Sequence, residues 1–127
     1  MVVDRLLGSW DLIGTEASVA AARKLARTAL GAAHPVVDDV MLLVSELVTN
    51  AVVHSESRGG TVTLTLLDGG DAIRVLVRDA GADRRPRVAG DLWREGGRGL
   101  LLVEEISHRW GVGEHHTGRT VWCEVKY

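Results

Sequence analysis

The chain has 127 residues, of which 46% are hydrophobic and 25% charged, with a formal net charge of −2. We therefore expect one globular domain over residues 1–127, and the charge excludes a strongly basic nucleic-acid-binding protein. No apolar run approaches the roughly 20 residues that span a bilayer, and the first residues are too short and too acidic for a signal peptide. The single cysteine, Cys123, excludes an internal disulfide and a cysteine-based zinc site, so we expect a cytoplasmic protein. From its charge and hydropathy we expect it to bind neither nucleic acid nor membrane.

Two elements are expected in the first part of the chain. Leu6–Ile13 mixes apolar and polar residues and is typical of a strand. A helix should follow, with Thr15 or Ser18 as its cap and Gly31 as its stop. Its buried stripe is predicted to contain Val19, Ala22, Leu25, Ala26 and Ala29.

The stretch from Pro35 to Ser55 has the clearest helical pattern. Pro35 suits a first helical position, and Asp38 and Asp39 place negative charge at the positive end of the helix dipole. Apolar residues recur at intervals of three and four, which predicts a buried face made of Val37, Val40, Met41, Val44, Val48, Ala51 and Val52.

A second face of this helix carries Glu46 and Asn50, four residues apart, with His54 one turn further on. Side chains at this spacing point into the same small volume. Two interpretations stay open, the polar face of an ordinary amphipathic helix or a functional site. Apolar neighbours favour a site, because a carboxylate half sunk among them is costly without a polar or cationic partner. Glu46 could then act as a general base and Asn50 could bind magnesium, whereas His54 is more typical of a cap.

The second half of the chain predicts two hairpins and one further helix. In order, the segments are strand Thr61–Leu67, turn Asp68–Asp71, strand Ala72–Arg78, helix Leu100–Trp110, and a final overlapping strand pair, His108–His116 and Thr117–Tyr127. Gly118 would supply the last turn. The order of elements predicts an α+β fold, a two-layer sandwich with helices on one face of a mixed, mostly antiparallel sheet.

Asp79 closes the second of these strands, and Gly81 follows two residues later. An acid at a strand end is often only a turn former. Alternatively, a fixed carboxylate could accept the exocyclic amino group of adenine, where guanine presents a carbonyl. Gly81 would then let the ring approach the backbone closely.

Gly96–Gly99 leads directly into the apolar helix that begins at Leu100. Glycines that open a helix leave N–H groups available for phosphate, although a flexible loop has the same composition. The segment is neither a P-loop, because no Gly-Lys-Ser or Gly-Lys-Thr is present, nor a dinucleotide fingerprint.

Three stretches together, SELVTNAVVH at 45–54, VRDAG at 77–81 and GRGLLLVEEIS at 97–107, resemble the three boxes of the GHKL (Bergerat-fold) ATP-binding family. They are most similar to the bacterial anti-sigma-factor serine/threonine kinases and to short actinobacterial ATP-binding regulators. The resemblance covers nearly the whole chain and implies the Bergerat fold, with ATP and Mg²⁺ as cofactors.

The resemblance also implies a role for each matching residue. Asn50 would hold the magnesium ion, and Glu46 would activate the attacking hydroxyl or water. Asp79 would receive the adenine amino group with Gly81 leaving room for the ring, and Thr120 would support both through water. The residues expected at the phosphates are Gly97, Arg98, Gly99 and Leu100.

Two functions follow from this resemblance. One is a serine/threonine kinase that phosphorylates an anti-anti-sigma (STAS-type) partner and so holds or releases a sigma factor; the other is a non-catalytic ATP-binding regulator that grips another protein. Glu46 favours the kinase. After Gly81 the better-known kinases of the family have another glycine, whereas this chain has a basic segment with Arg84, Arg85 and Arg87, and this departure favours the regulator. These arginines could clamp phosphates or could simply be solvated. A detached histidine-kinase ATPase module is a third hypothesis, and a homodimer through the first strand and helix is also implied.

Overall fold

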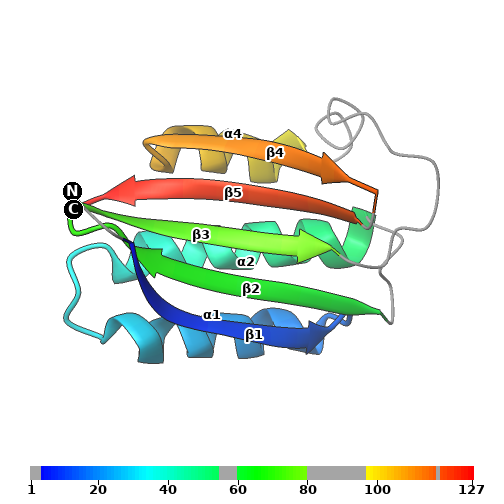
Figure 1. The fold of residues 1–127 in the computed structure, drawn as a ribbon, viewed down its shortest axis with the longest axis horizontal. Helices are drawn as coiled ribbons and strands as arrows, with labels where there is room; N and C mark the ends of the chain where they lie inside the picture. Colours follow the sequence, from blue (N-terminus) through cyan, green and yellow to red (C-terminus); the bar gives the residue numbers. More distant parts are fainter. Residues whose placement is uncertain (1–3, 55–59, 80–96, 117) are drawn as a thin grey trace.

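The computed structural model describes residues 4–54, 60–79, 97–116 and 118–127, with the side chains at 54 and 97–100 outside that description. The elements in chain order are β1 (Arg5–Ile13), α1 (Ala17–Leu30), α2 (Val37–His54), β2 (Thr61–Asp68), β3 (Ala72–Asp79), α4 (Gly97–Ile106), β4 (Arg109–His115) and β5 (Gly118–Lys126). The strands form one sheet in the order β1-β2-β3-β5-β4, and each pairing between them is antiparallel. The described helices α1, α2 and α4 lie on one face of this sheet (Figure 1). The predicted two-layer α+β fold is confirmed, with an antiparallel sheet in the described part where a mixed one was expected.

The central strands β2 and β3 alternate between the two faces of the sheet, as their sequences predict. Val62, Leu64 and Leu66 of β2 are fully buried on the helix side, while the threonines between them are partly exposed. On β3 the buried apolar residues are Ile73, Val75 and Val77. Because one face of each strand is covered by helices and the other is open, a period of two is sufficient to place these side chains.

Helix α2 is the centre of the helical layer. It packs against β3, with α1 on one side and α4 on the other. Its buried residues are Val37, Val40, Leu43, Val44, Leu47, Val48, Ala51 and Val52. The predicted face is confirmed except for Met41, which is only partly buried, but Leu43 and Leu47 were missed. A helix with neighbours on three sides buries a wider arc than a single amphipathic stripe.

The starts of the first two helices differ from the prediction, and α2 begins at Val37, two residues after the expected Pro35. Neither Thr15 nor Ser18 caps α1, because Glu16 occupies the N-cap position without a side-chain bond. The Ser18 hydroxyl instead donates to the Ile13 carbonyl at 2.5 Å, which ties α1 to the end of β1. Gly31 does end α1, at φ 93°, with its N–H donating to the Arg27 carbonyl.

Helix α4 ends four residues earlier than its apolar spacing indicates. The sequence predicts helix up to Trp110, but α4 stops at Ile106. The His108 N–H donates to the Glu124 carbonyl at 2.7 Å and so begins the ladder of the final hairpin. Trp110 then lies opposite Cys123 and packs against the core from β4, a position that the helical pattern could not distinguish from a helix face.

Both predicted turns are present. The β2–β3 turn uses Gly70 at φ 90°, whose N–H donates to the Asp68 carboxylate at 2.8 Å. Gly118 has φ 146° where β5 begins, a conformation that favours glycine. In the described ranges, none of the helices is long and apolar enough to cross a bilayer.

Candidate active site

The predicted site residues come from elements that meet at one end of the molecule. Figure 1 shows the end of α2, the end of β3, the start of β5 and the start of α4 at the same end of the two-layer structure. Helix α2 contacts both β3 and α4, and β3 pairs with β5 along its length. The fold therefore brings together four segments that are far apart in the sequence.

Glu46 and Asn50 project from α2 one helical turn apart, and both are partly buried. Leu42 and Val53 lie on the same face of the helix yet are 38% and 55% exposed. Polar residues are normally the more exposed ones, so this face reverses the usual order. A partly enclosed carboxylate and carboxamide with oxygens in one volume favour the site interpretation over an ordinary solvated face. His54 is the last residue of α2, and its side chain lies outside the described part.

Asp79 is the last residue of β3 and is only 2% exposed. It continues the alternation of Val75 and Val77, so its carboxylate faces the helical layer. The residue opposite Asp79 on the neighbouring strand β5 is Arg119. The Arg119 Nη2 atom lies 3.7 Å from Asp79 Oδ2, and the two side chains are only 10% and 3% exposed. A buried carboxylate is therefore met by a buried cation at the end of β3, as the cost of burying charge requires.

Thr120 does not lie where the family resemblance placed it. Its cross-strand partner is Arg78, one position from Asp79, so its side chain points to the open face of the sheet. There its hydroxyl is 3.4 Å from the ring nitrogen Nε2 of His115. Arg119, and not Thr120, therefore lies on the same side of the sheet as Asp79. Arg119 was not among the predicted site residues, although it is in phase with Val121, Cys123 and Val125, whose alternation favours the helix side.

The glycine-rich segment forms the first turn of α4. Gly97, Arg98, Gly99 and Leu100 are helical in their backbone, and α4 packs against α2. A helix start of this kind directs N–H groups and the positive end of the dipole outward. Gly81 and the arginines at 84, 85 and 87 lie outside the described residues.

The family is decided by comparison with known proteins. Residues 14–124 match the family described as the histidine kinase-like ATPase domain. The chain belongs to this family. No curated protein matches the chain. The match runs from the end of β1 to β5, so it includes every site residue discussed above. The GHKL resemblance is confirmed at this level, and the chain is an ATP-binding domain of this family.

The described residues of this ATPase domain would suit a magnesium ion that takes most of its ligands from a bound nucleotide and water. None of the described His, Cys, Asp and Glu side chains forms a group of three that could hold a metal ion. Magnesium seldom needs such a group, since it usually keeps water and phosphate ligands and takes one or two protein oxygens. The amide oxygen of Asn50, partly buried next to Glu46, is a suitable single ligand.

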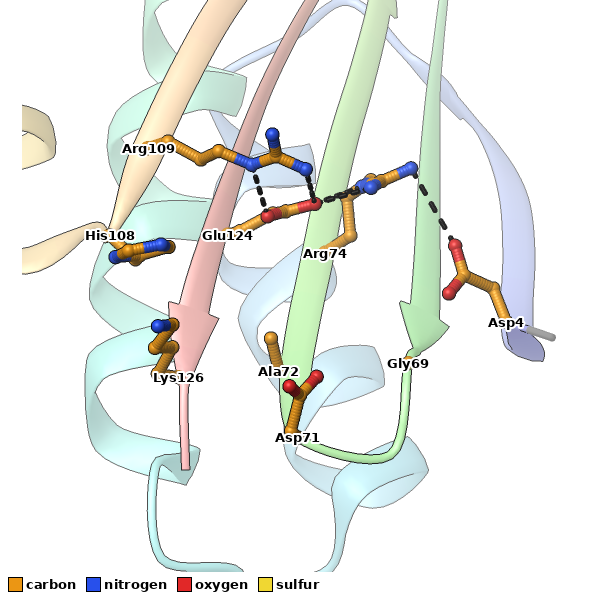
Figure 2. Close-up of a pocket in the computed structure, with 9 residues that line it drawn as sticks. All are labelled: Asp4, Gly69, Asp71, Ala72, Arg74, His108, Arg109, Glu124 and Lys126. Atoms are coloured by element: carbon orange, nitrogen blue, oxygen red, sulfur yellow. Dashed lines mark hydrogen bonds and ion pairs between the residues drawn. The ribbon is translucent and has the colours of Figure 1, made fainter. Parts of the chain in front are cut away.

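A separate pocket of about 350 Å³ lies on the opposite, open face of the sheet (Figure 2). It is lined by residues of β3, β4 and β5 together with Asp4, Gly69, Asp71 and His108. Glu124 stands at its centre and accepts from Arg109 Nε at 2.6 Å and from Arg74 Nε at 2.7 Å. Arg74 also lies 3.6 Å from Asp4. Trp122 supports both guanidinium groups, which lie 5.9 and 5.7 Å from its ring centre.

The charges in this pocket are directed at one another. The hydrogen bond from Arg109, followed by that from Arg74, holds the pKa of Glu124 down at about 2, although desolvation opposes them. The carboxylate therefore stays charged at neutral pH and joins three strands through its two arginines. We assign this cluster to the stability of the sheet.

Proposed function

We propose that this histidine kinase-like ATPase domain is a magnesium-dependent serine/threonine protein kinase of the anti-sigma type. The observation that carries the proposal is the partial burial of Glu46, which lies one helical turn from Asn50. Leu42 and Val53, the apolar residues on the same helix face, are more exposed than Glu46 and Asn50. A carboxylate in this position is available as a base beside a hard oxygen ligand.

In the proposed reaction, Glu46 accepts the proton of a serine hydroxyl on an anti-anti-sigma (STAS-type) partner. The serine oxygen forms a bond to the γ-phosphorus of ATP, the bond from that phosphorus to the bridging oxygen breaks, and ADP leaves. Asn50 would hold magnesium, which neutralises phosphate charge when it is bound. Asp79 would accept the adenine amino group, and the first turn of α4 would direct its N–H groups to the phosphates. Phosphorylation of the partner would then change which protein holds a sigma factor.

The test separates binding from transfer. Calorimetric titration with ATP and GTP, with and without magnesium, measures binding; transfer of labelled γ-phosphate to a serine-containing STAS-type protein measures catalysis. We expect Glu46→Gln to bind Mg-ATP like the unaltered protein and to lose transfer by at least about 100-fold, the usual contribution of a positioned base. Asp79→Asn should weaken ATP binding. Glu105→Gln, an exposed acid in the last turn of α4, is the matched control and should change neither.

Each result decides something about the kinase. If Glu46→Gln transfers phosphate as fast as the unaltered protein, Glu46 is not the general base. Unchanged ATP affinity of Asp79→Asn would mean that adenine binds elsewhere. The second candidate is a non-catalytic ATP-binding regulator, in which the buried Asp79–Arg119 pair would hold adenine and the bound nucleotide would set the shape of a surface that grips another protein. Tight Mg-ATP binding without transfer to any STAS-type protein would support that regulator and contradict the kinase.

A further inference from the structure

A buried cation, Arg119, lies beside Asp79 in the proposed adenine subsite. Arg119 lies directly opposite Asp79 on the neighbouring strand β5. It is on the helix side of the sheet and is 9% exposed as a whole residue. The guanidinium and the carboxylate are at ion-pair distance, 3.7 Å between Nη2 and Oδ2. A carboxylate only accepts hydrogen bonds and a guanidinium only donates them, so the end of β3 presents an acceptor and a donor side by side.

We propose that Arg119 is a specificity-determining residue that reads ring nitrogen N1 of adenine while Asp79 reads the neighbouring amino group. The inference rests on the proposed ATP-binding role of Asp79. On adenine, the amino group at position 6 is a donor and N1 is an acceptor, so the base edge offers the complement of the Asp79–Arg119 pair. A guanidinium carries five N–H donors in a planar fork, more than one carboxylate can accept, and can therefore serve a carboxylate and a ring nitrogen together.

The same pair explains how guanine would be rejected. Guanine carries a carbonyl at position 6 and a donor at N1, the reverse of adenine. With Asp79 facing position 6, a guanine base would place oxygen against carboxylate and N–H against guanidinium. Both contacts are unfavourable, and buried polar groups left in that state are costly.

A simpler role would be that Arg119 only neutralises the buried Asp79. The two roles predict different things for ligands. If Arg119 is only a counter-ion, its contribution to ligand affinity does not depend on the atom at position 1 of the base. If Arg119 donates to N1, it raises the affinity only for bases that have this nitrogen. The distinction can be measured with 1-deaza-ATP, in which N1 is replaced by C–H, and with 7-deaza-ATP, which is altered at the other edge of the base.

The experiment compares the affinity of the full chain for ATP, 1-deaza-ATP and 7-deaza-ATP by calorimetry in the presence of magnesium. A hydrogen bond from a charged donor supports a preference of about 10- to 100-fold for ATP over 1-deaza-ATP, with 7-deaza-ATP binding like ATP. Arg119→Met should bind ATP more weakly and should lose the preference. Arg78→Met, a cation one position along β3 on the open face, is the control and should keep it.

Equal affinity of the unaltered chain for ATP and 1-deaza-ATP would overturn the proposal without any variant, as would an Arg119→Met protein that keeps the full preference. If Arg119→Met does not fold, Arg119→Lys retains the charge and replaces the fork with one ammonium group; it should reduce the preference, and an unchanged preference would again contradict the proposal. Absence of any ATP binding by the unaltered chain would instead refute the proposed function itself, so the two failures are distinguishable.

Discussion

The carboxylate of Glu124 should make the stability of the sheet depend on pH. Its pKa lies at about 2 in the folded chain against an ordinary 4.5, chiefly because Arg109 and then Arg74 donate to it. A lowered carboxylate pKa stabilises the folded state at pH values above 4.5, and this contribution is lost as the pH falls toward 2. A tenfold change in proton affinity is about 1.4 kcal/mol, so the upper limit is roughly 3 kcal/mol. Because the Arg109 side chain is 59% exposed and screened by water, we expect about 1–2 kcal/mol at pH 7.

The measurement is urea unfolding of the unaltered chain and of Glu124→Gln at several pH values between 3 and 7, followed by far-ultraviolet circular dichroism. The difference in unfolding free energy should be largest above pH 5 and should shrink steadily below pH 4.5. Glu105→Gln, an exposed acid on α4, serves as control and should stay within about 0.5 kcal/mol at every pH. A difference for Glu124→Gln that is the same at pH 3 and pH 7 would refute the electrostatic explanation, because only the ionised carboxylate attracts the two arginines.

Three further predictions follow from the core and the open face. Burial raises the pKa of the Cys123 thiol to about 12, so a thiol reagent at pH 8 should label the unfolded chain and leave the folded chain almost unlabelled; rapid labelling of the folded chain would contradict this burial. Leu43→Ala should cost about 2–5 kcal/mol in urea unfolding, because Leu43 is fully buried in the core, and a loss below 1 kcal/mol would show that the site is not closely packed. Gly111→Ala should destabilise by about 1–3 kcal/mol, since its Cβ would lie 2.8 Å from the Trp122 ring, whereas Gly113→Ala, whose nearest contact is 3.8 Å, should cost clearly less; equal losses would contradict the steric argument.

The sequence predicts those elements that are buried on one face only, because their apolar residues then recur with the period of the strand or helix. Strands β2 and β3 have one covered and one open face, so their alternating residues identify both the strands and the sides. The same holds for the face of α2 that contacts the sheet. Leu43 and Leu47 were missed because α2 is covered by α1 and α4 as well as by the sheet, and this tertiary arrangement buries a wider arc than one amphipathic stripe.

The candidate site could be predicted in part for a similar reason. Glu46 and Asn50 lie four residues apart on one helix, and helix geometry alone places them together. Asp79 could be recognised as the end of a strand with a buried side, and its burial is confirmed. What the sequence could not supply is the arrangement between elements, in this case which residue of a strand about 40 positions later lies beside Asp79.

Strand β5 shows which part of that arrangement its own sequence contains and which part it does not. Val121, Cys123 and Val125 alternate with Trp122 and Glu124, so a period of two already favours the odd-numbered positions for the helix side. The alternation does not say which residue of β3 lies opposite each of them, and a slip of one residue in the pairing would exchange every side chain between the faces. The ladder with β3 settles this, because it places Arg119 opposite Asp79 and leaves Thr120 on the open face. In the proposed adenine subsite, a cation that can donate directly to the base therefore takes the place of a hydroxyl that would act through water.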